Sequence, residues 1–255
     1  MPVRIVPPTA HKMNDDPREV YKTTLEDAVR DFGRLFTNPD GSTLRSPGQS
    51  FLWSELRALV DLANYDFPGV AVHYGVSAGE LRYAISVLDM TPVLDGQGKR
   101  TGYTFNVLGD PDYVLENNDF LSFAERPQWT GWAAEYQNVL VDENNNGNTA
   151  PVREVFGAKA VVFPWREELL EMFIGNCPSA ICEGWRVVLS SITIDHSSQN
   201  SYRHGVAFHL EERRGFPKRW FPFLDDTNWA VLYQNKGANF GNLCPPSCDT
   251  YTSPV

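Results

Sequence analysis

One pattern that occurs twice in this chain constrains its fold more than any other feature. Each time, an aromatic-X-Trp triplet opens an apolar helix, and a glycine and two β-rich runs follow the helix. The first copy begins at Phe51-Leu52-Trp53 and the second at Phe163-Pro164-Trp165, and their strands follow at Gly69 and Gly184. Helices that precede consecutive strands, instead of alternating with them, favour an α+β fold with antiparallel sheets. We therefore expect two similar helix-plus-antiparallel-strand modules. We interpret them as a degenerate internal duplication, with two unrelated α+β units as the alternative.

The pattern divides the 255 residues into five segments. Prolines near the N-terminus disfavour helix and indicate an extended arm, and an asparagine-rich run indicates a linker between the modules. The segments are the N-terminal arm (1–16), the first module (17–141), the polar linker (142–157), the second module (158–240) and a cysteine-bearing C-terminal tail (241–255).

Periodicity and turn residues place the main elements within the modules. In the first module we expect a helix over 17–36, a second helix that begins after Ser50 and ends before Pro68, strands over 70–76, 81–88 and 103–107, and an aromatic helix from Trp129. Ser77-Ala78-Gly79-Glu80 and Asp95-Gly96-Gln97-Gly98 are typical of tight turns, and residues 109–127 are expected to form a loop or a short helix. In the second module we expect a strand over 158–163, a helix over 164–174, and strands over 185–194, 203–211 and 229–233.

Composition argues against some classes of function. Acidic residues outnumber basic ones by 32 to 22, which gives a formal net charge of −10. Nucleic-acid binding requires a basic surface that releases phosphate counterions, so we expect no nucleic-acid partner. No run approaches the ~18 apolar residues of a membrane span, and the N-terminus lacks the apolar core of a signal peptide. We expect a cytoplasmic protein, or alternatively one that is released or surface-exposed without a recognisable signal peptide.

Four cysteines lie in two close pairs, Cys177 with Cys182 and Cys244 with Cys248. Four thiolates can complete a tetrahedral zinc site, although zinc knuckles more often place their cysteines closer together than these pairs do. In a reducing cytoplasm free thiols are the default, whereas disulfides become the expectation outside the cell. Zinc, disulfides and free thiols are therefore three interpretations of these residues.

The same half of the chain carries two longer motifs, Cys182-Glu183-Gly184-Trp185-Arg186 after a helix and Cys244-Pro245-Pro246-Ser247-Cys248 near the end. It resembles a loosely defined group of uncharacterised Bacteroidota proteins, in which a helix leads to C-x-G-x-R and the chain ends in C-P-P-x-C. The resemblance covers residues 163–249. It implies a bacterial host and a paired role for Cys182 or Cys177 with Cys244 or Cys248. It brings no activity and no catalytic residues.

The linker contains the first half of a calcium-loop pattern. Asp142, Asn144 and Asn146 occupy positions one, three and five of such a loop, and Gly147 follows at position six. A calcium loop places an acidic bidentate ligand at position twelve, where this chain has Arg153, with Glu154 one residue later. An asparagine-rich linker explains the same residues without calcium.

Two histidines are the candidates for catalysis. His196 lies in Asp195-His196-Ser197-Ser198, which contains the residue types of a hydrolase triad, and His204 lies in the following strand. A triad, however, is assembled from residues that are distant in sequence, and the chain has no G-x-S-x-G elbow. A hydrolase with a cleft between the two modules is therefore an alternative function, with His196 or His204 acting beside nearby acids.

An aromatic segment at 219–224 is a candidate binding surface. It contains Trp220, Phe221 and Phe223, and its proline and the charged residues around it indicate a loop. Exposed aromatic side chains concentrate binding energy at interfaces. A carbohydrate- or protein-binding module that uses this loop is a further alternative.

A duplicated α+β unit without an active-site signature is typical of a structural subunit. We therefore predict a self-assembling protein that forms a filament, tube, sheath or coat, with copies of itself as partners and with no cofactor. The N-terminal arm would add Val3, Ile5 and Val6 as a strand to the sheet edge of a neighbouring copy. The C-terminal tail would be exchanged between copies in the same way.

Overall fold

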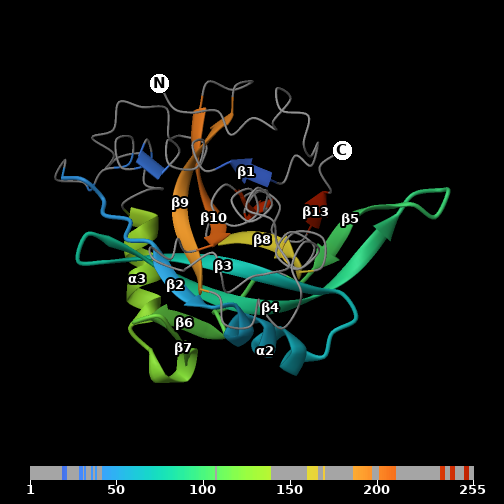
Figure 1. The fold of residues 1–255 in the computed structure, drawn as a ribbon, viewed down its shortest axis with the longest axis horizontal. Coiled ribbons are helices and arrows are strands. Elements are labelled where there is room, and N and C mark those ends of the chain that lie inside the picture. Colours follow the sequence, from blue (N-terminus) through green and yellow to red (C-terminus); the bar gives the residue numbers. More distant parts are fainter. Residues whose placement is uncertain are drawn as a thin grey trace, which may run out of the picture.

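The strands form two sheets that face each other across a shared apolar core (Figure 1). The structure is a computed structural model, and it describes residues 19–21, 29–30, 32, 36, 38, 42–106, 108–138, 160–165, 169, 186–196, 201–210, 236–238, 242–244 and 250–252.

The two sheets differ in size, and their strands pair antiparallel. The five-stranded sheet has the order β1-β11-β10-β9-β2. Its strands are β1 (Glu19–Tyr21), β2 (Gln49–Leu52), β9 (Arg186–His196), β10 (Ser201–Leu210) and β11 (Lys236–Ala238). The eight-stranded sheet has the path β12-β8-β3-β4-β5-β13, with β6 paired to β4 and β7 to β6. Its strands are β3 (Pro68–Ser77), β4 (Glu80–Leu94), β5 (Arg100–Phe105), β6 (Tyr113–Glu116), β7 (Asp119–Ser122), β8 (Ala160–Pro164), β12 (Asn242–Cys244) and β13 (Thr250–Thr252).

Two helices accompany these sheets in the part of the chain that the structure describes, α2 (Trp53–Ala63) and α3 (Trp129–Tyr136), and η1 (Phe123–Glu125) is a short 3-10 helix. The predicted α+β class, with mostly antiparallel strands, is confirmed. None of the helices described is long and apolar enough to cross a membrane.

The sequence explains both ends of α2. The Leu52 N–H donates to Glu55 Oε2 at 3.1 Å, which satisfies a backbone donor that the first helical turn cannot pair. Asn64 ends the helix with a φ of 53°, a left-handed conformation that asparagine tolerates well. The buried side chains are Trp53, Leu56 and Val60, one stripe of the helix surface.

The core lies between one face of each sheet. Val72 of β3 and Ile85 of β4 pack there with Leu189 of β9 and Val206 of β10. The opposite face of β3 is also covered, because a Cβ added to Gly75 would lie 3.0 Å from Trp132 Cβ. The first turns of α3 therefore pack closely on the outer face of the eight-stranded sheet, whereas Tyr136 at the end of the helix lies in the shared core.

Each sheet combines strands from both predicted modules. β2 precedes α2 in the first module, yet it pairs with β9 of the second, with Phe51 opposite Val187. β8 opens the second module, yet it pairs with β3 of the first, with Phe163 opposite Val70. The two halves are thus interleaved through these strands.

Four local predictions were wrong. Phe51 and Leu52 belong to β2 and Pro164 to β8, where we expected the first residues of helices. Strand β1 replaces the start of the expected helix over 17–36, because Glu19–Tyr21 pair with β11, whereas Val29, Arg30 and Phe32 are helical as expected. Residues 109–127 contain the short helix η1, as expected, but also the hairpin of β6 and β7, whose turn residues Asn117 and Asn118 have φ values of 52° and 69°. In the first three cases, pairing with distant strands overrides local preference.

The turn between β3 and β4 was predicted correctly, and its geometry gives a test. Ala78 and Gly79 have φ values of 52° and 71°, as in the type I′ turns that favour Asn-Gly. Alanine is strained there, so Ala78→Asn should raise the free energy of unfolding by about 0.5–1 kcal/mol, measured by urea denaturation. Gly79→Ala is the matched opposite change and should destabilise the protein. A loss of stability in Ala78→Asn would contradict this turn.

Candidate functional site

Most of the predicted site residues lie outside the residues that the structure describes. They are Val3, Ile5 and Val6 of the arm, Asp142, Asn144 and Asn146 of the calcium pattern, Cys177, Cys182 and Cys248, and Trp220, Phe221 and Phe223 of the aromatic loop. Cys244 and His196 are placed by backbone pairing, opposite Ala160 and Ser201. Within the described part of the chain, no group of three or more His, Cys, Asp or Glu side chains could hold a metal ion.

His204 lies at the centre of a buried polar network between the two sheets. Its Nδ1 hydrogen-bonds the Tyr136 hydroxyl at 2.8 Å and its Nε2 the Ser191 hydroxyl at 2.8 Å. Ser191 Oγ also hydrogen-bonds the Tyr83 hydroxyl at 2.5 Å. The network therefore connects α3, the five-stranded sheet and strand β4 of the eight-stranded sheet.

The surroundings of His204 are aromatic and exclude water. Its ring centroid lies 4.2 Å from that of Tyr74 and 4.9 Å from that of Phe32, and its side chain has no exposed surface. Burial lowers the pKa of His204 to about 3, so the imidazole is neutral at pH 7. Because both ring nitrogens are engaged and no solvent reaches them, this arrangement favours a structural role.

His196 and His204 do not lie opposite each other in the pair of strands β9 and β10. His204 pairs with Thr193, so His196 lies three residues further along β9, roughly 10 Å at the usual rise per residue. The described geometry therefore does not bring the two candidate histidines together, and His204, the one whose side chain is described, has hydroxyl groups and not acids as its hydrogen-bond partners.

A second buried histidine, His73, also has a hydrogen-bond partner inside the protein. His73 Nε2 lies 2.8 Å from the Ser86 hydroxyl, between β3 and β4. Burial lowers the pKa of His73 to about 4. His73 points to the face of β3 opposite that of Tyr74, because alternate residues of a strand face opposite sides.

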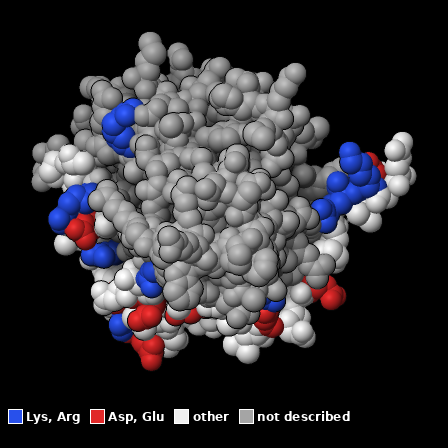
Figure 2. Space-filling view, in the orientation of Figure 1, with Lys and Arg blue, Asp and Glu red and all other residues white. Residues whose placement is uncertain are grey.

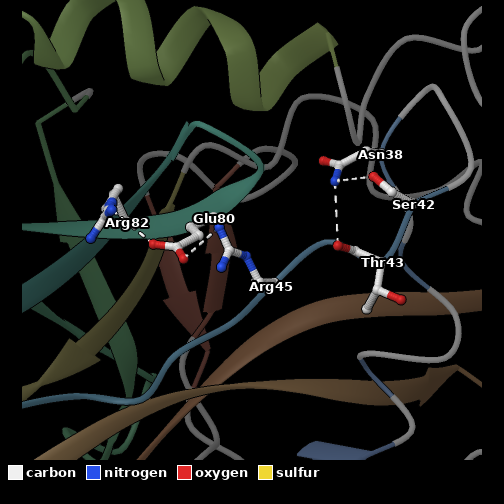
Figure 3. Close-up of polar contacts among 6 residues, drawn as sticks. All are labelled: Asn38, Ser42, Thr43, Arg45, Glu80 and Arg82. Atoms are coloured by element: carbon white, nitrogen blue, oxygen red, sulfur yellow. Dashed lines mark hydrogen bonds and ion pairs between the residues drawn. The ribbon is translucent and has the colours of Figure 1, made fainter.

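A partly exposed polar cluster holds the segment before β2 against the β3–β4 turn (Figure 3). Glu80 accepts from Arg45 at 2.8 Å and from Arg82 at 2.9 Å. Asn38 Nδ2 donates to Ser42 Oγ at 2.9 Å and to the Thr43 carbonyl at 3.3 Å. Exposed ion pairs contribute little stability, and we interpret this cluster as a positioning contact.

The hairpin of β4 and β5, from Met90 to Phe105, projects away from the two sheets (Figure 1). β4 pairs with β3 as far as Asp89, and from Met90 to Leu94 its described pairing is with β5. Met90 and Phe105 are buried at the base, whereas Val93 and Leu94 are 40% and 57% exposed. We call residues 90–105 the projecting hairpin.

The turn at the end of the projecting hairpin is well defined. Asp95 Oδ1 accepts the N–H groups of Gln97 at 2.9 Å and Lys99 at 2.8 Å, and Gly98 has a φ of 78°. The Arg100 guanidinium lies 5.0 Å from the centre of the Tyr103 ring. The hairpin therefore has an ordered turn at its end and ordered ring packing near its base.

The C-terminal tail lies along the edge of the projecting hairpin. β13 pairs with β5, with Thr250 opposite Thr104 and Tyr251 opposite Tyr103. The tail thus adds a strand to a sheet edge within the same chain, which is the type of contact predicted between copies.

Sequence reasoning located the turn at Asp95–Gly98 and missed the exposed residues beside it. The structure reveals them through a difference in length, since β4 has 15 residues and its partner β3 has 10. Two strands joined by a two-residue turn cannot pair along their whole length when they differ so much. The surplus of β4 has to extend beyond β3.

Comparison of the chain with protein-family models, with curated proteins and with solved structures finds no match.

Proposed function

We propose that this protein is a self-assembling structural subunit, of the kind that builds a filament, tube, sheath or coat. The observation that carries the proposal is the projecting hairpin, which places exposed Val93 and Leu94 beyond the two sheets. Beyond the residues of β5 that pair with β13, the described hairpin consists of two strands, and an isolated two-stranded ribbon is only marginally stable in water. Packing of the projecting hairpin against a second copy would remove this apolar surface from water and stabilise the ribbon.

The outer strands support exchange of chain segments between copies. β1, β12 and β13 come from the two end regions of the chain, and they lie at the outer positions of the two strand orders. Pairing at a sheet edge needs only backbone hydrogen bonds, so the added strand can come from the same chain or from another. In the assembly, β13 of one copy lies on β5 of the next.

We also infer that the two modules are a degenerate duplication. The pairings Leu52 with Arg186 and Phe51 with Val187 correspond in order to Pro164 with Gly69 and Phe163 with Val70. The rings of Trp53 and Trp165, the last residues of the two triplets, stack with centroids 5.0 Å apart and an angle of 12°. A chain that already joins its own halves by strand exchange has the geometry to join copies in the same way.

Light scattering and negative-stain microscopy of the purified protein test the proposal. We expect species larger than the 28.8 kDa chain that grow with concentration and form regular particles. A monodisperse 28.8 kDa monomer at high concentration would contradict the proposal.

Exchange of the tail can be tested with a cysteine pair. Thr104 and Thr250 are opposite each other, so Thr104→Cys/Thr250→Cys should form a disulfide under oxidation. Exchange between copies predicts ladders on a non-reducing gel, whereas a tail that stays on its own chain predicts cross-linked monomers. Thr104→Cys alone is the matched control, because the four native cysteines are present in both proteins.

A further inference from the structure

Large apolar side chains are exposed in only two places within the described residues. They are Leu62 (77%) and Tyr65 (40%) at the end of α2, and Val93 (40%) and Leu94 (57%) in the projecting hairpin. We call Asp61, Leu62, Tyr65 and Asp66 the helix-end patch. We call Val93, Leu94, Lys99 and Arg100 the hairpin tip.

The two surfaces carry opposite charges. In the helix-end patch, Asp61 and Asp66 flank the apolar pair, and both are exposed. Asp61 forms an exposed ion pair with Arg57 at 3.5 Å, so the electrostatic part of the contact is assigned to Asp66. At the hairpin tip, exposed Lys99 and Arg100 follow the apolar pair across the turn, while Asp95 is engaged by the backbone of that turn. Figure 2 shows Lys and Arg side chains gathered on the projecting hairpin with an acidic group among them, and acidic and basic side chains next to each other over the region of α2.

We propose that the hairpin tip of one copy docks on the helix-end patch of a second copy. This inference rests on the proposed function and identifies the surfaces that assembly uses. The two apolar pairs remove each other from water, and the charges around them attract. Both surfaces are exposed in the single chain, so neither is covered by the other within one copy. The contact joins two unlike surfaces, and such a contact can continue from copy to copy.

The apolar part of the contact is tested by Leu94→Asp and Leu62→Asp, each measured by sedimentation velocity. Both side chains are exposed, so the variants should keep the thermal stability of the wild type. Each variant should raise the dissociation constant of assembly by about tenfold or more, as expected for loss of a central apolar contact. Thr130→Asp, at an exposed position on α3, adds the same charge elsewhere and should assemble as the wild type does.

Mixing the two variants tests the pairing of unlike surfaces. Leu94→Asp keeps an intact helix-end patch and Leu62→Asp keeps an intact hairpin tip. An equimolar mixture should therefore form pairs of twice 28.8 kDa that do not grow further. A mixture that stays monomeric would overturn the proposed docking.

Charge reversal tests the electrostatic part. Lys99→Glu and Asp66→Lys should each weaken assembly by about tenfold at low salt, and the double variant should recover most of the wild-type affinity. Glu135→Lys, at an exposed site on α3, is the matched control for the added positive charge. If the wild type does not assemble, the proposed function fails and this inference fails with it. If the wild type assembles and these variants assemble equally well, this inference alone is wrong.

Discussion

Replacing His204 with alanine is expected to lower the free energy of unfolding by about 3–5 kcal/mol. The substitution leaves a cavity between the two sheets, and the Tyr136 hydroxyl loses the hydrogen bond that His204 Nδ1 forms with it. Ser191 also loses its hydrogen bond to His204 and keeps the one to Tyr83. Urea denaturation followed by tryptophan fluorescence measures the change. A loss below about 1 kcal/mol would contradict a central role for this network.

Two tyrosines provide a matched control for the hydrogen bonds alone. Tyr136 and Tyr74 lie with ring centroids 5.1 Å apart, and both contact His204. The Tyr136 hydroxyl is hydrogen-bonded to His204, whereas the buried Tyr74 hydroxyl has no partner among the described groups. Tyr136→Phe should therefore destabilise the protein by about 1–3 kcal/mol, and Tyr74→Phe should be neutral or stabilising. Equal losses of unfolding free energy in both variants would show that the hydrogen bond between Tyr136 and His204 does not account for the destabilisation.

The pH dependence of stability distinguishes the effect of the titratable imidazole of His204 from the effect of a cavity at its position. The pKa of His204 is about 3 in the folded chain and near 6.5 when unfolded. Between these values the unfolded state binds more protons, so stability falls as the pH decreases from 6.5 towards 3, by up to about 1.4 kcal/mol per pH unit. His73, with a pKa of about 4, adds to this slope. The slope should become shallower in His204→Phe, which removes the titrating group and keeps a large side chain.

Elements that depend on local chemistry could be predicted from the sequence. The turn at Ala78-Gly79 and the stripe of Leu56 and Val60 follow from backbone preference and periodicity within a few residues. Strand β2 could not be predicted in this way. Its Ser50 hydroxyl accepts from Arg186, which is 136 residues further along the chain, at 3.0 Å. A strand defined by a partner so distant carries little signal in its own four residues.

The candidate surfaces were missed for a related reason. Val93 and Leu94 fit the apolar composition of a strand, and their sequence does not indicate whether another element covers them. Only the register shows that β3 ends its pairing at Asp89 and leaves them exposed. His204 is the reverse case, since a titratable residue that suggested catalysis is instead buried and satisfied by hydroxyl groups. Exposure is a property of the assembled sheets, and a single sequence determines it only through the whole fold.

Replacing Trp53 with alanine is expected to cost about 3–5 kcal/mol of stability, because a fully buried indole is lost. Trp53 is 1% exposed and its ring stacks on that of Trp165, which is 4% exposed. Trp53 directly follows β2, which joins the five-stranded sheet, and Trp165 directly follows β8, which joins the eight-stranded sheet. The stacked pair therefore lies where the two halves exchange strands, and its loss should weaken both exchanges.

A double-mutant cycle on this pair also tests the inferred duplication. If the two tryptophans are equivalent, Trp165→Ala should destabilise the chain about as much as Trp53→Ala, and the coupling energy should be about 0.5–1.5 kcal/mol, as for other stacked aromatic pairs. Trp132→Ala is the control for loss of an indole elsewhere, since Trp132 is only partly buried on the outer face of β3. It should cost less than either. A cost for Trp165→Ala much smaller than that for Trp53→Ala would mean that the two triplets do not hold equivalent positions, and the repeated pattern would then be coincidence.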